Sequence, residues 1–452
     1  MKVYLQTLGC KLNESELEAW ARDFTAHGDE VVNDPSAADT IVLNTCTVTA
    51  QAARKSRNLA RHLARANTDA QIILTGCYAT LSAGQARALP NVAFVVPNSE
   101  KDRLVRLAGE RLGAADFQLA ANGCRLPEAV SGELVGDSTT LFRVKELRSV
   151  LRTRAFVKIE DGCNMSCSYC IIPLARGRAR SRPQKEILDE IKQLVDSGYR
   201  EVILTGVQIS DYRLEERVAG SERLRGLCDL VSSILRETNL PRLRLTSIAP
   251  WDLEEELLDL FADARLCRHL HLSLQSGSTT VLRRMRRPYT AEQFAGAVEL
   301  ARAKIPDVAI STDVIVGFPG EADVEFQESL EFVERMNFAR VHVFPYSSRE
   351  GTLAAKLPLP VSDLIKDARA KAMQRVADAS LRRFTGRFVG RTLSVLYEED
   401  ENAPGVWSGY TDNYIRVVTR SRENMANRIV PTRLVEAVED GARGEILESV
   451  SI

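Results

Sequence analysis

The stretch Asp161-Gly-Cys163-Asn-Met-Ser-Cys167-Ser-Tyr-Cys170 sets three cysteines at CxxxCxxC spacing. A short apolar run just before it predicts a strand, so the cysteines follow a strand end. Thiolates are the usual protein ligands of iron–sulfur clusters, and three of them leave one iron of a four-iron cluster open. A zinc site is the alternative, but zinc normally takes four ligands, and the next cysteine along the chain is Cys228.

Working outward from this triplet, strands alternate with helical segments, which indicates right-handed crossovers and a parallel sheet. The strands are expected at 154–159, 200–204, 242–246, 269–274, 308–316 and 340–344. Six β/α units are too few for a closed eight-stranded barrel, so a partial (β/α)6 TIM barrel is predicted. A charged helix expected at 361–384 follows, and the short alternating strands after it predict a small terminal β-barrel.

The N-terminal part also alternates strands with helices, which predicts a second parallel sheet, of flavodoxin-like type. Its strands are expected at 2–8, 40–44, 71–75 and 92–96. Cys10, Cys46 and Cys77 each fall one to three residues after a strand. Because the carboxyl ends of parallel strands share one edge of a sheet, these cysteines are expected to converge there. Three incidental buried cysteines are the alternative.

The fold class is therefore α/β, and 452 residues are too many for one ordinary core. The expected parts are an N-terminal cluster domain, a connection, a partial-barrel domain and a terminal barrel, at 1–115, 116–148, 149–384 and 385–452. The nine cysteines argue against a disulfide framework, and Cys124, Cys228 and Cys267 match no pattern. With no leader and no apolar run of about 18 residues, a cytoplasmic protein without a membrane segment is expected.

The triplet makes the chain resemble the radical S-adenosylmethionine (SAM) superfamily. The stretches Leu8-Gly-Cys10-Lys-Leu-Asn13 and Asn44-Thr-Cys46-Thr-Val-Thr49 narrow this resemblance to its methylthiotransferase family, over nearly the whole chain. The terminal barrel is similar to TRAM domains. The resemblance implies two [4Fe-4S] clusters, one that cleaves SAM to start radical chemistry and one that donates sulfur.

The resemblance also assigns site residues. It gives the first cluster to Cys163, Cys167 and Cys170, and the sulfur-donating cluster to Cys10, Cys46 and Cys77. It places SAM beside Tyr169 and around polar or glycine-bearing strand ends. The residues at those strand ends are Thr205, Gly206, Ser273, Gln275 and Gly317.

Within the family, Gly9-Cys10-Lys11 and Phe344-Pro-Tyr346 look most like the branch that acts on tRNA N6-threonylcarbamoyladenosine. That branch forms the 2-methylthio derivative at position 37, 3′ to the anticodon. The open alternatives are isopentenyladenosine of tRNA, an aspartate of a small-subunit ribosomal protein, and a non-enzymatic iron–sulfur protein that binds RNA or carries electrons. The expected partners are the anticodon stem-loop of tRNA, SAM, and an electron donor such as a flavodoxin or ferredoxin.

Two sets of arginines could bind RNA phosphates, and a solvated charged face is the alternative for each. They are Arg54, Arg57, Arg61 and Arg65 on one helix arc, and the run Arg176, Arg178, Arg180 and Arg182 after the triplet. The terminal barrel has 8 basic and 11 acidic residues from position 386 on, so it is mildly acidic. RNA contacts there would use Arg416 and Arg420, or base stacking on Tyr410 and Tyr414 unless those rings are core.

Overall fold

The computed structural model describes residues 1–112, 145–146, 153–217, 224–399 and 405–447. Contacts within the chain divide it into two units, Met1–Arg148 and Ser149–Ile452. Cys124 and nearly all of the expected connection lie outside the described residues, and the finer division into four parts stays a prediction. No helix in the described part of the chain is long and apolar enough to cross a membrane.

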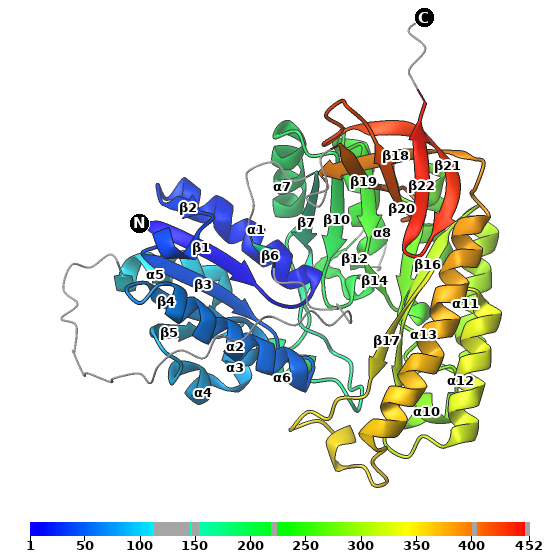
Figure 1. Cartoon of the computed structure of the whole chain (residues 1–452), viewed down its shortest axis with the longest axis horizontal. Helices are drawn as coiled ribbons and strands as arrows, with labels where there is room; N and C mark the ends of the chain where they lie inside the picture. Colours follow the sequence, from blue (N-terminus) through cyan, green and yellow to red (C-terminus); the bar gives the residue numbers. More distant parts are fainter. Residues whose placement is uncertain (113–144, 147–152, 218–223, 400–404, 448–452) are drawn as a thin grey trace, which may run out of the picture. The chain divides into compact units, whose positions relative to one another are not determined.

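The first unit is a parallel sheet of order β2-β1-β3-β4-β5 (Figure 1), the doubly wound order of flavodoxin-like folds, as expected. The strands are β1 (Lys2–Thr7), β2 (Glu30–Val32), β3 (Thr40–Thr45), β4 (Gln71–Thr75) and β5 (Val92–Val96), with β6 (Lys145–Glu146) antiparallel to β1. The helices are α1 (Lys11–Ala26), α2 (Ala50–Ala66), α3 (Gly76–Leu81), α4 (Ala83–Arg87) and α5 (Leu104–Leu112). Successive residues of β3 point to opposite faces of the sheet: Ile41 and Leu43 pack with α2, whereas Val42 packs with α1 and α5.

The second unit contains the partial barrel, six parallel strand positions in sequence order. They are β7 (Arg154–Lys158), β10 (Glu201–Thr205), β13 (Arg242–Leu245) continued by β14 (Ser247–Ile248), β15 (His269–Leu272), β16 (Ala309–Val316) and β17 (Arg340–Pro345). Every neighbouring pair is parallel, and a bridge from Leu243 to Leu266 joins the two halves. The predicted strands are thus found where the sequence placed them.

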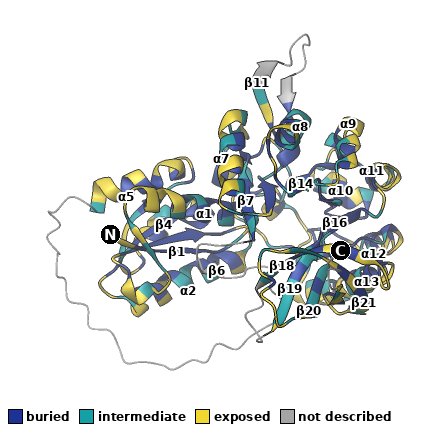
Figure 2. Cartoon of the chain, turned by 90° about the horizontal axis from the view of Figure 1, so that it is seen from above, coloured by how far each residue is buried: buried dark blue, intermediate teal, exposed yellow. Residues whose placement is uncertain are grey.

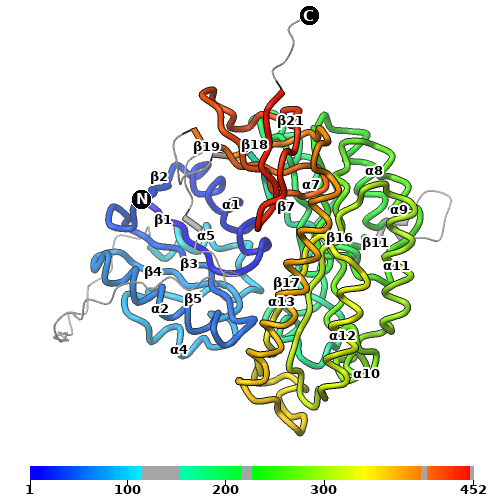
Figure 3. The backbone as a smooth tube through the Cα atoms, turned by 45° about the vertical axis from the view of Figure 1, so that its right-hand side comes forward, coloured from blue at the N-terminus to red at the C-terminus, as the bar shows by residue number. Residues whose placement is uncertain are grey.

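Helices cover the outer side of the partial barrel. They include α7 (Gln184–Asp196), α8 (Leu227–Glu237), α9 (Glu255–Asp259), α11 (Ala291–Lys304), α12 (Asp323–Met336) and α13 (Asp363–Gly386). Figure 2 shows the strands buried and the outer sides of helices such as α5 and α7 exposed. Figure 3 shows the long α13 running beside β17. A helix expected at 222–237 begins only at Leu227, as α8, because β11 (Arg213–Arg217) and β12 (Leu224–Gly226) pair antiparallel before it.

The terminal barrel is closed, with strand order β18-β19-β20-β22-β21. Its strands are β18 (Thr392–Glu399), β19 (Val406–Thr411), β20 (Arg416–Arg420), β21 (Ile429–Val438) and β22 (Gly441–Ile446). Its core contains Val395, Tyr397, Val417 and Leu434, and Phe388 closes it from the end of α13. The small β-barrel is confirmed. The sequence pattern predicts strands at 392–397, 414–419 and 429–436, which correspond to β18, β20 and β21, whereas β19 and β22 were not predicted.

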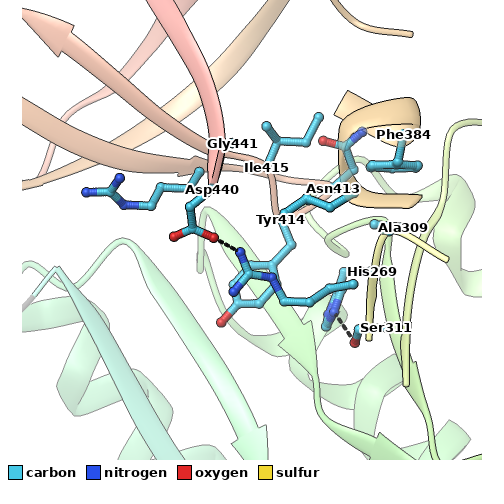
Figure 4. A pocket seen from close by; sticks show the side chains of 13 residues that line it. His269, Ala309, Ser311, Phe384, Asn413, Tyr414, Ile415, Asp440 and Gly441 are labelled. Atoms are coloured by element: carbon cyan, nitrogen blue, oxygen red, sulfur yellow. Dashed lines mark hydrogen bonds and ion pairs between the residues drawn. The ribbon is translucent and has the colours of Figure 1, made fainter. Parts of the chain in front are cut away.

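The terminal barrel is attached to the amino ends of the parallel strands. Arg154, the first residue of β7, makes a bidentate pair with Glu398 at 2.8 and 2.9 Å. Arg244 is fully buried and donates to the carbonyls of Thr411 and Asp412. Figure 4 shows a pocket at this junction, where strand residues such as His269 meet Tyr414 of the β19–β20 turn. Ligands of parallel barrels bind at the opposite, carboxyl end, so this junction stabilises the fold and leaves that end accessible.

Candidate functional site

The triplet loop is anchored at both of its ends. It leaves β8 (Glu160–Asp161), which pairs with β9 (Arg180–Ser181), and Asp161 accepts a buried 2.9 Å bond from Arg176. Gly162 has φ +88°, and a Cβ there would lie 2.1 Å from the carbonyl oxygen of Arg178. Only glycine fits this crossing. The loop therefore has a fixed start before the first cysteine.

The triplet's thiols lie in an environment that suits a polynuclear cluster. Burial raises the pKa of Cys163 to about 11 and that of Cys170 to about 12, so these ligands need a metal to hold them as thiolates. The Cys167 sulfur accepts from Arg287 Nη1 at 3.4 Å.

The number of ligands distinguishes the two metal sites. Zinc in a structural site normally takes four protein ligands. The triplet supplies three thiols from one anchored loop, and three thiolates leave one iron of a four-iron cluster open. This ligand set favours an iron–sulfur cluster over zinc.

The expected SAM-binding positions lie at the same carboxyl end of the strands. Thr205 ends β10, and Ser273 and Gln275 follow β15. The carbonyl of Ser273 accepts from Tyr289 at 2.8 Å and from Arg287 at 3.1 Å. Tyr169 packs against an apolar cluster that includes Met285, Phe318 and Tyr346. The structure thus gathers these positions around the triplet's end of the barrel.

Both predicted glycines have a packing reason that the sequence did not reveal. A Cβ on Gly206 would lie 2.8 Å from the Glu160 carboxylate, and one on Gly317, at φ +71°, would lie 2.4 Å from Lys366. Close approach of a neighbouring side chain, rather than of a ligand, therefore accounts for glycine at these two positions. A role of their backbone groups toward SAM stays a prediction.

Two residues beside the triplet were not identified from the sequence. Arg287 connects the Ser273 carbonyl to the Cys167 sulfur and stacks over Trp251 and Tyr289. Glu160 is fully buried, its Oε2 accepts from the amides of residues 207 and 208, and burial raises its pKa to about 8. A basic run at 283–287 contains Arg287, but nothing in that run distinguishes it from its neighbours.

The structure brings the loops of Cys10, Cys46 and Cys77 together at one sheet edge. Strands β1, β3 and β4 are adjacent, and their last paired residues, 7, 44 and 75, stand in one row. Each cysteine follows that row by two or three residues. A Cβ on Gly9 would lie 3.2 Å from the Cys46 sulfur, and Gly76 makes a bridge to Thr45. The expected convergence of the three cysteine loops is therefore present.

A buried polar network supports these three loops. Lys101 and Glu16 form an ion pair and are 1% and 2% exposed. Asn44 donates to Glu16 at 3.0 Å, and Lys101 donates to Asn98 at 3.3 Å. Asn98 in turn donates to the Cys77 sulfur at 3.6 Å. The network joins the loops after β3 and β4, and its members Lys101 and Asn98 lay outside every stretch that the sequence singled out.

The candidate RNA-binding arginines separate into exposed and structural ones. Arg54, Arg61 and Arg65 of α2 are exposed, and Arg57 lies 5.6 Å above the ring of Tyr78, next to Cys77. In the run after the triplet, Arg178 and Arg180 are exposed. Arg176 and Arg182 instead pair with Asp161 and Glu190.

The tyrosines considered for base stacking are neither on the outer surface nor in the barrel core. Tyr410 and Tyr414 stack on each other with ring centroids 5.0 Å apart, beneath Arg154 and Arg244 of the partial barrel. Both rings pack within the junction between the partial barrel and the terminal barrel. Arg420 is exposed, whereas Arg416 is half-buried beside the junction pocket.

Comparison with known proteins gives two family matches. Residues 157–333 match the radical SAM superfamily, and residues 2–97 match a family described as uncharacterized protein family UPF0004. The two matches cover the two cysteine constellations separately.

Several relatives match along nearly their full length. A Bacillus subtilis protein named threonylcarbamoyladenosine tRNA methylthiotransferase MtaB is 34% identical over 96% of this chain and 94% of its own. Its Thermotoga maritima namesake is 36% identical over 94% and 92%. An Erythrobacter litoralis tRNA-2-methylthio-N(6)-dimethylallyladenosine synthase is 31% identical over 99% and 97%. The structure of a radical SAM methyltransferase, TsrM, from Kitasatospora setae aligns over 76% of this chain and 72% of its own, with TM-score 0.53 and 17% identity, which shows a shared fold.

Proposed function

Since this chain belongs to the family of radical SAM methylthiotransferases, we propose that it acts on N6-threonylcarbamoyladenosine in tRNA. The product is the 2-methylthio derivative at position 37, and the partners are the anticodon stem-loop and SAM. The observation that carries the proposal is the pair of cysteine constellations, each at the carboxyl edge of a parallel sheet. An electron carrier that binds RNA would need neither two such sites nor the partial barrel that matches the radical SAM superfamily.

Membership in the radical SAM superfamily implies a [4Fe-4S] cluster and SAM. Cys163, Cys167 and Cys170 are the proposed ligands, because they sit on an anchored loop beside the carboxyl ends of the parallel strands. When bound, the cluster supplies the electron that cleaves SAM. Arg287 donates to the Cys167 sulfur and holds the Ser273 carbonyl, so it fixes the position of the loop relative to β15.

A second [4Fe-4S] cluster, the sulfur donor, is proposed at Cys10, Cys46 and Cys77. Three converging loops on neighbouring strands can present three thiolates to one group. Asn98 donates a hydrogen bond to the Cys77 sulfur, which holds that sulfur in position. The Lys101–Glu16 pair holds Asn98 and Asn44 in place.

Contacts to the substrates are proposed at the level of segments. SAM is expected to bind at Tyr169 and along the strand ends, that is, at Thr205, Gly206, Ser273, Gln275 and Gly317. Phosphates of tRNA are expected to bind the exposed arginines of α2 and of the run after the triplet. A flavodoxin or ferredoxin as electron donor, and a cytoplasmic location, remain predictions.

The decisive experiment is mass spectrometry of nucleosides from total tRNA of a strain that lacks this gene, beside its parent. The proposal predicts loss of 2-methylthio-N6-threonylcarbamoyladenosine and accumulation of its unthiolated precursor. Loss of the methylthio group from the dimethylallyl nucleoside would instead assign the chain to the other tRNA branch, whose members reach 31–32% identity. If both nucleosides are unchanged, a protein substrate such as the ribosomal aspartate becomes the first alternative.

Cysteine variants separate the two proposed clusters. Cys163→Ala should abolish SAM cleavage, so continued formation of 5′-deoxyadenosine by this variant would disprove the triplet assignment. Cys46→Ala should still cleave SAM but form no methylthio product. Cys267→Ala is the matched control, because Cys267 is buried beside Glu201 at the amino end of the strands.

A further inference from the structure

A polar ladder runs along the inner face of the partial barrel. His271 pairs in register with Ser311, and Asp313 pairs with His342, across β15, β16 and β17. The alternating residues Ile310 and Val314 belong to the core beneath the helices, so Ser311 and Asp313 point to the opposite face. Closed parallel barrels fill that face with branched aliphatic side chains. Polar groups here need a different explanation.

The three titratable groups of this ladder lie close together. His271 Nε2 is 3.1 Å from Asp313 Oδ2, and its Nδ1 is 3.1 Å from the hydroxyl of Ser311. The ring centroids of His271 and His342 are 6.1 Å apart. All three side chains remain partly exposed to solvent. We call His271, Asp313 and His342 the inner triad.

Along the strands, the inner triad lies between the triplet at their carboxyl ends and the junction with the terminal barrel at their amino ends. Ser273 follows His271 by one pleat, about 7 Å along β15, and its carbonyl accepts from Arg287, which also donates to the Cys167 sulfur. At the amino end, Tyr414 stands against His269 with ring centroids 4.5 Å apart. A ligand therefore reaches the inner triad from the carboxyl end, past the triplet.

We propose that the inner triad binds the polar substituent on N6 of the substrate adenine, an inference that rests on the proposed function. A threonylcarbamoyl group carries a urea N–H, a hydroxyl and a carboxylate. The Asp313 carboxylate can accept from the N–H or the hydroxyl, and an imidazole N–H of His342 can donate to the substrate's carboxylate. His271 binds Asp313 and Ser311 and so orients Asp313. A dimethylallyl group offers neither donor nor acceptor.

The inner triad thereby selects the substrate branch. A site built to hydrogen-bond a substituent discriminates strongly against an analogue that lacks it, because its buried polar groups lose solvent without gaining partners. On β17, Phe344 follows His342 on the same face, one pleat closer to the carboxyl-end mouth. An apolar residue at position 342 is expected to suit the hydrocarbon substituent better.

The test uses the reconstituted enzyme and three anticodon stem-loops that carry threonylcarbamoyladenosine, dimethylallyladenosine or plain adenosine at position 37. For His342→Phe and Asp313→Ala we expect the Kd for the first RNA to rise at least about tenfold, with less than a twofold change for plain adenosine. The kcat/KM ratio of the first RNA over the second should fall by about 100-fold. His342→Gln, which keeps a donor, should retain part of the preference, and His27→Phe at an exposed position should retain all of it.

The outcomes separate this inference from the proposed function. If the wild-type enzyme methylthiolates only the dimethylallyl RNA, the proposed function is wrong. If it prefers the threonylcarbamoyl RNA and both variants keep that preference, the inner triad has no role in selection. The triad's ligand atoms also lie within 4.8 Å of one another, as in a site for one transition-metal ion. Elemental analysis that finds one such ion beyond the cluster iron, lost in Asp313→Ala, would overturn the inference.

Discussion

Replacing Lys101 by Met removes one partner of the buried ion pair that supports the loops of Cys10, Cys46 and Cys77. Methionine keeps the length of the side chain, so no large cavity forms, but Glu16 is left charged at 2% exposure. The Asn44 amide, at 3.0 Å, still donates to it, but no longer beside a positive charge from Lys101. Breaking a buried pair in this way costs about 3–5 kcal/mol, and we expect the first unit to lose that much stability.

Hydrogen exchange is the suitable assay, because it reports the first unit separately from the second. Peptides covering β1, β3 and β4 should exchange about 150 to 5,000 times faster in Lys101→Met. The double variant Glu16→Gln/Lys101→Met removes both charges and should recover at least about half of the loss. Arg106→Met breaks an exposed pair with Glu110 on α5 and should leave these peptides unchanged.

Two results would refute this reasoning. A change below about 1 kcal/mol in Lys101→Met would mean that the Glu16 charge is solvated or neutralised without its partner. A double variant as unstable as the single one would mean that the lost lysine contacts, and not the isolated carboxylate, cause the effect. The iron content of the same variants links stability to function: Lys101→Met should bind less iron, because Asn98 loses the group that holds it beside Cys77.

Three further predictions concern the second unit. Burial raises the pKa of Glu160 to about 8. The stabilisation that its protonated carboxyl gives is therefore complete below the ordinary pKa of 4.5 and is lost as pH rises through 8. Because glutamine stays neutral, Glu160→Gln should raise Tm more at pH 8.5 than at pH 5. Gly162→Ala places a methyl group 2.1 Å from the Arg178 carbonyl at φ +88°, and urea unfolding should show a loss of about 1–3 kcal/mol together with a lower iron content. Arg244→Met leaves the buried Glu201 without its bidentate partner and frees two barrel carbonyls, so trypsin should release the terminal barrel faster than in wild type.

Features that repeat along the chain could be predicted from the sequence. Most strands of the two parallel sheets carry an apolar or alternating run between helical segments, although the short β2 was not predicted, and the triplet has a spacing that few chemistries share. The convergence of Cys10, Cys46 and Cys77 followed from topology alone, because parallel strands end at one edge. These predictions depend on local patterns and on one general rule of chain connection.

Features that depend on pairs of distant residues could not be predicted. Lys101 and Glu16 look like ordinary surface charges in the sequence, and only the packing of α1 against the end of β5 buries them together. Arg287 is one of four arginines in five residues, and its backbone position alone selects it for Cys167. The inner triad required the register of three strands, which periodicity does not give.

The acidity of the terminal barrel seemed to argue against RNA binding, and the junction explains why it does not. Glu398 and Asp412 pair with Arg154 and Arg268 of the partial barrel, while Asp307 of the partial barrel receives two arginines from the barrel side. Charge pairs therefore cross the junction in both directions, and the net charge of the segment does not describe its outward face. Among the described residues of the terminal barrel, exposed arginines at 420, 422, 428, 433 and 443 are matched in number by exposed acidic residues at 423, 436, 439, 440 and 445. Because buried arginines fix the barrel to the amino ends of the strands, any RNA held there is held rigidly relative to the triplet.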